Sequence, residues 1–228
     1  MTNSRGPSEG AQGPDHFARK EYDDKARFAS YWHQVTEVLE AGPETILEVG
    51  IGNRFLCEHL RKRNLRVSTC DIDARVKPEV VGSVTALPFK PATFDMVVSF
   101  EVLEHLPYEV FCAALRELSR VSRGPVIISL PDLTRHVFLH VKLPWIGAHS
   151  WLVACNWHPP ETVCTVGEHY WEIGVRGYPL RRICGDIERA GLRLVRSYRV
   201  VECPLHRFFV LEPRGSSEVD LAAAKARP

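Results

Sequence analysis

The stretch Ile46-Leu47-Glu48-Val49-Gly50-Ile51-Gly52 decides the fold of this chain. Apolar and β-branched residues lead into an acid and two glycines, as in a buried parallel strand that turns tightly beneath a ligand. A dinucleotide fingerprint would place a third glycine three residues after the second, for close approach of the pyrophosphate, and Phe55 stands there. The stretch therefore predicts a nucleotide-binding strand and loop, and it disfavours a dinucleotide.

The composition suits one domain with a large core. The chain has 228 residues, of which 45% are hydrophobic, enough for one domain but not for two. Lysine and arginine together number 29 against 28 acidic residues, so no broad charge favours nucleic acid or an anionic membrane. Seven scattered cysteines predict reduced thiols, and no stretch approaches the roughly 18 apolar residues of a membrane span. We expect a cytoplasmic protein.

The N-terminal part combines a polar end with an aromatic-rich helical pattern. Residues 1–14 are polar and rich in Gly, Ser and Pro, which predicts disorder, and 214–228 are expected to form a flexible tail. Residues 15–41 have a helical pattern. This segment either packs its aromatic side chains on the sheet edge or closes as a lid over bound ligands, and Tyr22 and Trp32 are the residues to test.

Strands and helices alternate along the rest of the chain. The expected strands are 46–49, 67–70, 80–82, 94–100 and 125–130, followed by 192–201 and 208–211 as a terminal hairpin. The expected helices are 55–64, 110–121 and 178–190. This order predicts a largely parallel sheet with right-handed crossovers.

Acids and a histidine follow two of these strands. Asp71 ends the second strand, about 20 residues past the glycines, where a carboxylate accepts hydrogen bonds from both hydroxyls of a ribose. The alternative is a turn or helix-cap role, which suits Asp73 better. Glu101-Val102-Leu103-Glu104-His105-Leu106 follows strand 94–100 directly. Ligands of open α/β sheets sit beyond that edge, so this segment is expected near the chemistry.

Five ordered motifs together resemble the class I S-adenosylmethionine-dependent methyltransferases. They are Ile46 to Gly52, Cys70-Asp71-Ile72-Asp73, Leu87-Pro88-Phe89, Phe94-Asp95-Met96-Val97-Val98 and Glu101-Val102-Leu103-Glu104-His105. The match is dense over residues 44–131 and looser to 213. It implies an α/β, Rossmann-like three-layer sandwich whose seven-stranded, mostly parallel sheet has an antiparallel last strand. Residues 15–213 would form this domain, with the lid at 15–41 and a substrate insert at 131–177.

The resemblance also implies S-adenosyl-L-methionine as the cofactor. By analogy, Gly50 and Gly52 pass beneath its methionine part, and Glu48 supports the loop or binds the amino group. Asp71 would hold the ribose. The other implied contacts lie at the adenine and at the methionine end, and they come from Ile72, Ser83, Val84 and Phe100.

Two positions depart from the family pattern. Arg54 stands where a third glycine is frequent, and Ser83 stands where an acid often binds the adenine amino group. We expect Arg54 at a helix start with ordinary right-handed φ values, or with its guanidinium on a carboxylate of cofactor or substrate. Ser83 can still accept one hydrogen bond from the amino group.

The insert 131–177 is rich in histidine and tryptophan. It holds His136, His140, His149, His158, His169, Trp145, Trp151, Trp157 and Trp171. Such long inserts are usually functional. In methyltransferases of this kind the insert sets substrate specificity, and His169 is the leading candidate at the substrate.

A hydroxyl acceptor would benefit from His169 or His105 as a base, whereas an amine need only be neutral. The alternative role for His105 is a cap at the end of its local helix, and the alternative for His169 is a packing or lid-hinge role. Cys155, His158, Cys164 and His169 lie close in sequence, but they lack a Cys-x-x-Cys pair, so no metal site is predicted.

The sequence thus predicts a methyltransferase that acts on an oxygen, ahead of a nitrogen, of a small-molecule or sugar-containing acceptor. A protein or RNA methyltransferase is the nearest enzyme alternative, although the charge balance disfavours RNA. A non-catalytic S-adenosylmethionine-binding module is the alternative from another class. The oligomeric state stays open.

Overall fold

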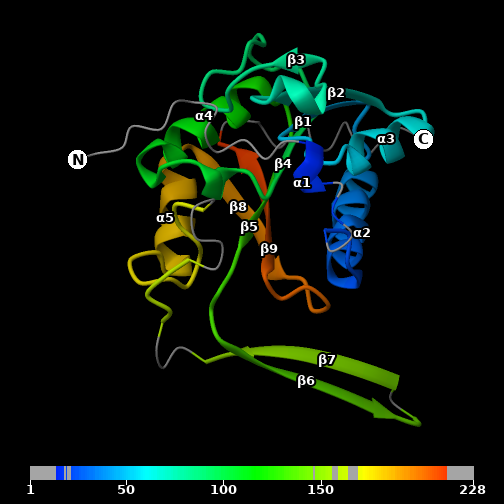
Figure 1. Ribbon diagram of the computed structural model, residues 1–228, viewed down its shortest axis with the longest axis vertical. Coiled ribbons are helices and arrows are strands. Elements are labelled where there is room, and N and C mark those ends of the chain that lie inside the picture. Colours follow the sequence, from blue (N-terminus) through cyan, green and yellow to red (C-terminus); the bar gives the residue numbers. More distant parts are fainter. Residues whose placement is uncertain are drawn as a thin grey trace.

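A seven-stranded sheet forms the centre of the computed structural model, which describes residues 14–17, 19, 22–145, 147–155, 159–163 and 169–214 (Figure 1). Its strands are β1 (Thr45–Val49), β2 (Arg66–Asp71), β3 (Val80–Val81), β4 (Met96–Phe100), β5 (Val126–Pro131), β8 (Leu192–Arg199) and β9 (His206–Pro213). Their order is β3-β2-β1-β4-β5-β9-β8. The first five strands pair in parallel, and β9 runs antiparallel to both β5 and β8. The predicted sheet and its antiparallel last strand are confirmed.

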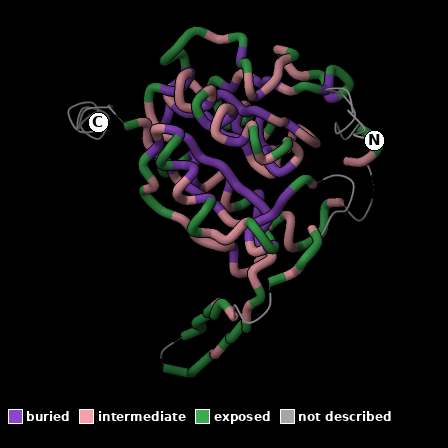
Figure 2. Tube along the Cα trace, turned by 90° about the vertical axis from the view of Figure 1, so that its left-hand side faces the viewer, coloured by how far each residue is buried: buried purple, intermediate pink, exposed green. Residues whose placement is uncertain are grey.

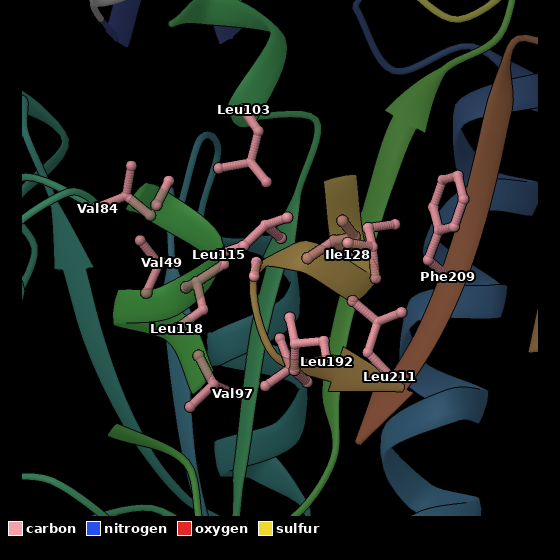
Figure 3. Packing of buried hydrophobic residues seen from close by; sticks show 14 of the residues in the cluster. Val49, Val84, Val97, Leu103, Leu115, Leu118, Ile128, Leu192, Phe209 and Leu211 are labelled. Carbon is pink, nitrogen blue, oxygen red and sulfur yellow. The ribbon is translucent and has the colours of Figure 1, made fainter. Parts of the chain in front are cut away.

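Helices cover both faces of this sheet. Figure 1 shows α2 (Lys25–Ala41) and α3 (Phe55–Lys62) on one side, with α4 (Phe111–Val121) and α5 (Leu180–Arg189) on the other. Apolar strand residues alternate between two buried clusters, because successive side chains point to opposite faces of the sheet. Val97 and Ile128 pack with Leu115 and Leu118 of α4 (Figure 3). The three-layer sandwich is therefore confirmed.

Shorter helices lie in the connections. They are α1 (Pro14–Phe17) and three 3₁₀ turns, η1 (Ala74–Val76), η2 (Leu103–His105) and η3 (Tyr108–Val110). The predicted helix over 15–41 is wrong in its first part, since α1 ends at Phe17 and α2 begins at Lys25. Asp24 explains the break, because its carboxylate accepts a 2.8 Å hydrogen bond from the backbone N–H of Arg27 and caps α2.

The insert contains a second sheet. Strands β6 (His136–Leu143) and β7 (Gly147–Ala154) form an antiparallel hairpin that projects from the body of the molecule (Figures 1 and 2). Its apolar side chains are largely exposed, and Trp145 near its tip is 96% exposed. A backbone hydrogen bond from Cys155 to Arg135 closes the base of the hairpin at 2.7 Å.

Some expectations fall outside the described residues. These include the disorder of residues 1–13 and the tail after Arg214, together with His158, Trp157 and Cys164. The six cysteines in the described part of the chain are free thiols. Across the same described residues, no helix has both the length and the apolar character that crossing a membrane requires.

Candidate active site

A cavity of about 550 Å³ lies beyond the carboxyl ends of β1, β2, β4 and β5. All ten residues predicted for the cofactor or the chemistry line it: Glu48, Gly50, Gly52, Asp71, Ile72, Ser83, Val84, Phe100, His105 and His169. The parallel strands bring these distant residues to one edge of the sheet. Their individual roles stay predictions.

The glycine loop is closely packed on the next connection of the sheet. Gly50 has φ +80°, and a Cβ there would overlap the side chain of Val102. Gly52 has φ +48° and lies opposite Phe17 of α1. Both φ values favour glycine, and at Gly50 a side chain would also collide with Val102. The backbone between β1 and α3 therefore runs along the cavity without side chains at these two positions.

Asp71 closes this loop from the neighbouring strand. One carboxylate oxygen accepts a hydrogen bond from Ile51 N–H at 2.8 Å, and the other accepts from Asp73 N–H at 2.9 Å. Each oxygen keeps a second lone pair for a ligand hydroxyl. Burial raises the pKa of Asp71. Asp73 is confirmed as a cap, because its side chain accepts from Arg75 N–H at the start of η1.

Glu48 is a buried acid with unused hydrogen-bonding capacity. Its residue is 5% exposed, and its Oε2 has no hydrogen-bond partner among the described residues. Burial raises its pKa to about 8, although hydrogen bonds from Cys57 oppose this shift. A cation or a charged amino group of a ligand beside Glu48 would lower its pKa again and favour the ionised carboxylate.

The adenine side differs from expectation at Ser83. Its hydroxyl contacts the Thr85 hydroxyl at 2.8 Å and accepts from Thr85 N–H at 3.3 Å. These contacts occupy the hydroxyl in a local turn, which leaves less capacity for an adenine amino group. Ile72 is 41% exposed and Val84 is buried beside the cavity, so apolar contact with a ring is available there.

Arg54 does not have the right-handed backbone predicted for it. Its φ is 68°, a left-handed value, so the position keeps the conformation that a glycine would take. The guanidinium donates to the carbonyls of Val76 and Lys77 at 3.1 and 2.5 Å and pairs with Glu58 at 3.1 Å. These bonds point the guanidinium to the turn at η1, and Arg54 does not line the cavity. The expected contact with a carboxylate of cofactor or substrate stays a prediction.

The N-terminal segment covers the other side of the cavity. His16, Phe17, Tyr22 and Tyr31 line it, and the Tyr31 hydroxyl joins Asp23 and Asn53 through hydrogen bonds of 3.0 and 2.8 Å. Trp32 is 62% exposed and does not line the cavity. The position of this segment is compatible with the predicted lid. Tyr22 lines the cavity and stays a residue with which to test the lid, whereas Trp32 lies outside the cavity.

The end of the insert brings His169 against His105. Their ring centroids lie 4.7 Å apart, and the two rings are nearly perpendicular. Tyr170 N–H donates to the Glu104 carbonyl at 2.9 Å, and the buried Trp171 indole donates to the Leu106 carbonyl at 3.1 Å. The segment after the hairpin is therefore fixed to the connection after β4. The hairpin histidines His136, His140 and His149 do not line the cavity.

Comparisons with known proteins agree with this geometry. Residues 47–128 match the family model described as a methyltransferase domain. Residues 47–128 therefore form a methyltransferase domain, in agreement with the resemblance that the sequence motifs carry. No curated protein matches it in sequence.

Solved structures show the methyltransferase fold over most of the chain. The Burkholderia thailandensis 1,6-didemethyltoxoflavin-N1-methyltransferase, with bound 1,6-didemethyltoxoflavin and S-adenosylhomocysteine, is 15% identical with a TM-score of 0.55, over 87% of this chain and 82% of that one. The Synechocystis PCC 6803 magnesium protoporphyrin IX methyltransferase is 14% identical with a TM-score of 0.56, over 82% and 84%. A glycopeptide N-methyltransferase is 13% identical with a TM-score of 0.54, over 89% and 99%.

S-adenosyl-L-methionine is the cofactor of this methyltransferase, and the cavity fits it. The glycine loop provides a floor without side chains at Gly50 and Gly52, and Asp71 has lone pairs for hydroxyls. The buried Oε2 of Glu48, unpartnered among the described residues, suits the amino group. Three separate observations therefore match the ribose and methionine parts of the molecule.

The methyltransferase cavity also contains residues that sequence reasoning did not select. Glu172 accepts a hydrogen bond from His169 Nδ1 at 2.5 Å and is fully buried. His206 contacts the Ser30 hydroxyl at 2.8 Å and lies 3.6 Å from Glu101. The spacing of three residues between His169 and Glu172 was the available signal for the first pair. His206 gave no such signal, since its partner lies on a distant helix.

Proposed function

We propose that the methyltransferase transfers a methyl group to an oxygen, ahead of a nitrogen, of a small-molecule acceptor. The carrying observation is that His105 and His169 form one wall of the same cavity whose other parts fit the cofactor. The toxoflavin and porphyrin enzymes named above act on small molecules by their names. Because their sequence identity to this chain is low, the atom that they methylate cannot be assigned to the acceptor of this chain.

The chain's own residues perform three tasks in this proposal. Asp71 and Glu48 hold the ribose and the amino group, and the lid of Phe17, Tyr22 and Tyr31 excludes water. When bound, S-adenosylmethionine would supply an electrophilic methyl group, with its neutral sulfide as the leaving group. His105 and His169 act at the acceptor hydroxyl, where they favour loss of its proton.

The test has two steps. Calorimetry with S-adenosylmethionine and S-adenosylhomocysteine measures cofactor binding, and incubation with methyl-labelled cofactor and a metabolite extract identifies the labelled product by mass spectrometry. His169→Ala and His105→Ala should lower turnover of a hydroxyl acceptor, whereas the hairpin variant His140→Ala should not. Cofactor binding without any labelled product would favour a binding module, and label only in protein or RNA would favour a macromolecular acceptor.

The proposal also includes the cellular compartment and the kind of partner. The free thiols among the described residues support work in the reducing cytoplasm. The near-balanced charge of 29 basic and 28 acidic residues supports a small-molecule partner over a nucleic acid.

A further inference from the structure

Three side chains at the acceptor end of the cavity form a compact group. Glu104 and His105 belong to η2, directly after β4, and His169 comes from the end of the insert. One ligand atom from each, a carboxylate oxygen or a ring nitrogen, lies within 4.8 Å of the other two. Bonds of about 2.0–2.2 Å to a common cation would require these atoms to approach by roughly an ångström. Small rotations of the three side chains would be enough for this approach.

Glu104 is the unusual member of this group. It is 0% exposed, and neither of its carboxylate oxygens has a hydrogen-bond partner among the described residues. Across that part of the chain no lysine or arginine pairs with it, and the nearest charged partner is His105 at 4.0 Å. A buried carboxylate in this position is costly unless it takes a proton or a cation.

The surroundings of Glu104 add negative rather than positive charge. Burial raises its pKa well above the ordinary value, and the neighbouring Glu101 and Glu172 raise it further. Glu101 also has a buried oxygen, Oε1, without a hydrogen-bond partner among the described residues. Three carboxyl groups thus meet at one wall of the cavity, and a bound cation would balance them.

His169 is held as a metal-binding histidine usually is. Its Nδ1–H donates to the buried Glu172 carboxylate at 2.5 Å, which leaves Nε2 as the nitrogen available to a ligand. A carboxylate behind an imidazole fixes the ring and strengthens it as a metal ligand. The bonds of Tyr170 and Trp171 to the backbone of residues 104 and 106 keep the two halves of the group together.

We infer that Glu104, His105 and His169 bind a divalent transition-metal cation, such as Zn²⁺ or Mn²⁺, at the acceptor end of the cavity. Two imidazoles and a carboxylate suit these cations better than Mg²⁺ or Ca²⁺, which prefer oxygen ligands alone. Three protein ligands leave positions open for an acceptor. The binding site stands on its own geometry, while its catalytic role rests on the proposed function.

The cation defines the acceptor as a hydroxyl compound. Coordination of the hydroxyl oxygen lowers its pKa, so that its proton passes to solvent as the acceptor binds, before the closed cavity excludes water. The oxygen lone pair then forms the bond to the methyl carbon, and the bond from that carbon to sulfur breaks with its electrons on sulfur. His105 and His169 act as ligands in this step, and neither needs to act as a base.

The experiment uses the full-length protein after dialysis against a chelator. Calorimetry with ZnCl₂ and MnCl₂ alone should show one cation per chain for at least one of the two metals, and elemental analysis should show that metal retained. Glu104→Gln and His169→Ala should weaken its binding about 100-fold or more, and Glu172→Gln by about 10-fold. The matched control His140→Ala removes an exposed hairpin histidine and should leave binding unchanged.

Thermal unfolding keeps the test decisive. Without metal, Glu104→Gln should unfold at a higher temperature than the wild type, since it removes an unpaired buried acid. Added metal should stabilise the wild type and leave the variant unchanged. Absence of stoichiometric binding to the wild type, or binding that survives both Glu104→Gln and His169→Ala, overturns the site. Methyl transfer that persists in such a metal-free protein leaves the proposed function standing, whereas metal binding without transfer leaves the site standing.

Discussion

Replacing Glu48 by Gln should stabilise the protein increasingly as the pH rises. Glu48 is almost fully buried, and burial raises its pKa to about 8 from the ordinary 4.5. The folded state therefore keeps the proton over a pH range in which the unfolded chain has released it. Glutamine has the same shape and no proton to lose, so the variant lacks this pH-dependent cost.

The size of the effect follows from the two pKa values. Each pH unit between 4.5 and about 8 removes roughly 1.4 kcal/mol from the free energy of unfolding of the wild type through this group. At pH 7 the accumulated difference between variant and wild type is about 3 kcal/mol relative to pH 4.5. Above pH 8 both states of Glu48 are ionised, and the difference should level off.

Urea unfolding of both proteins at pH 5, 6, 7 and 8 measures the difference without interference from other titrating groups. Glu58→Gln is the matched control, because Glu58 lies on the exposed side of α3 with its side chain 54% exposed. Its difference from the wild type should stay nearly constant with pH. Parallel curves for Glu48→Gln and the wild type would refute the assignment of a raised pKa to this acid.

Three further changes test other parts of the cavity. Asp71→Asn removes a charged acceptor of the predicted ribose bonds, so calorimetry should show cofactor affinity lower by about 10-fold or more. Arg54→Gly relieves a left-handed backbone but frees the turn at Val76, which lines the cavity. We expect unfolding free energy within about 1 kcal/mol of wild type in urea, with cofactor affinity a few-fold weaker. Replacing residues 136–154 by a short glycine turn should leave cofactor affinity unchanged, since the hairpin does not line the cavity and its base is closed by Cys155. The role of Asp71 would be contradicted by unchanged cofactor affinity in Asp71→Asn, and that of Arg54 by tighter binding in Arg54→Gly. Loss of cofactor binding on hairpin deletion would contradict the separation of the hairpin from the cavity.

The sheet was predictable because its strands carry strong local signals. Buried parallel strands are apolar almost throughout, and Met96 to Phe100 and Val126 to Leu130 fit that description. The glycines after β1 and Asp71 at the end of β2 then indicate which ends of these strands face a ligand. Residues that face the cavity from these strand ends were therefore accessible to sequence reasoning.

Arg54 shows where local reasoning fails. A left-handed backbone at a residue with a side chain is normally disfavoured, so the sequence alone indicates a right-handed value. The bonds of the guanidinium to the carbonyls at 76 and 77 hold the unusual conformation, and they span more than twenty residues. Distant contacts of this kind leave no periodic pattern.

The tryptophans of the insert illustrate the same limit. Trp171 is fully buried and donates to the Leu106 carbonyl, whereas Trp145 near the hairpin tip is 96% exposed. Both residues stand among histidines and aromatic residues in the sequence. Trp171 is buried because residues 169–173 pack beside η2, and Trp145 has no such contact within the described part of the chain. The sequence does not reveal this packing, since it pairs segments about 65 residues apart.

The charge at the acceptor end links the metal to the acceptor atom. Methylation of a neutral amine leaves a positive product, and Glu101, Glu104 and Glu172 would stabilise it if no cation were bound. A bound divalent cation reverses this preference, because an oxygen anion then sits between the cation and the positive sulfonium, and the transfer cancels charge in a site that excludes water. The same three carboxyl groups thus favour nitrogen in a metal-free protein and oxygen in a metal-bound one. Metal content and acceptor atom should therefore change together, which makes elemental analysis the measurement that narrows the acceptor search most.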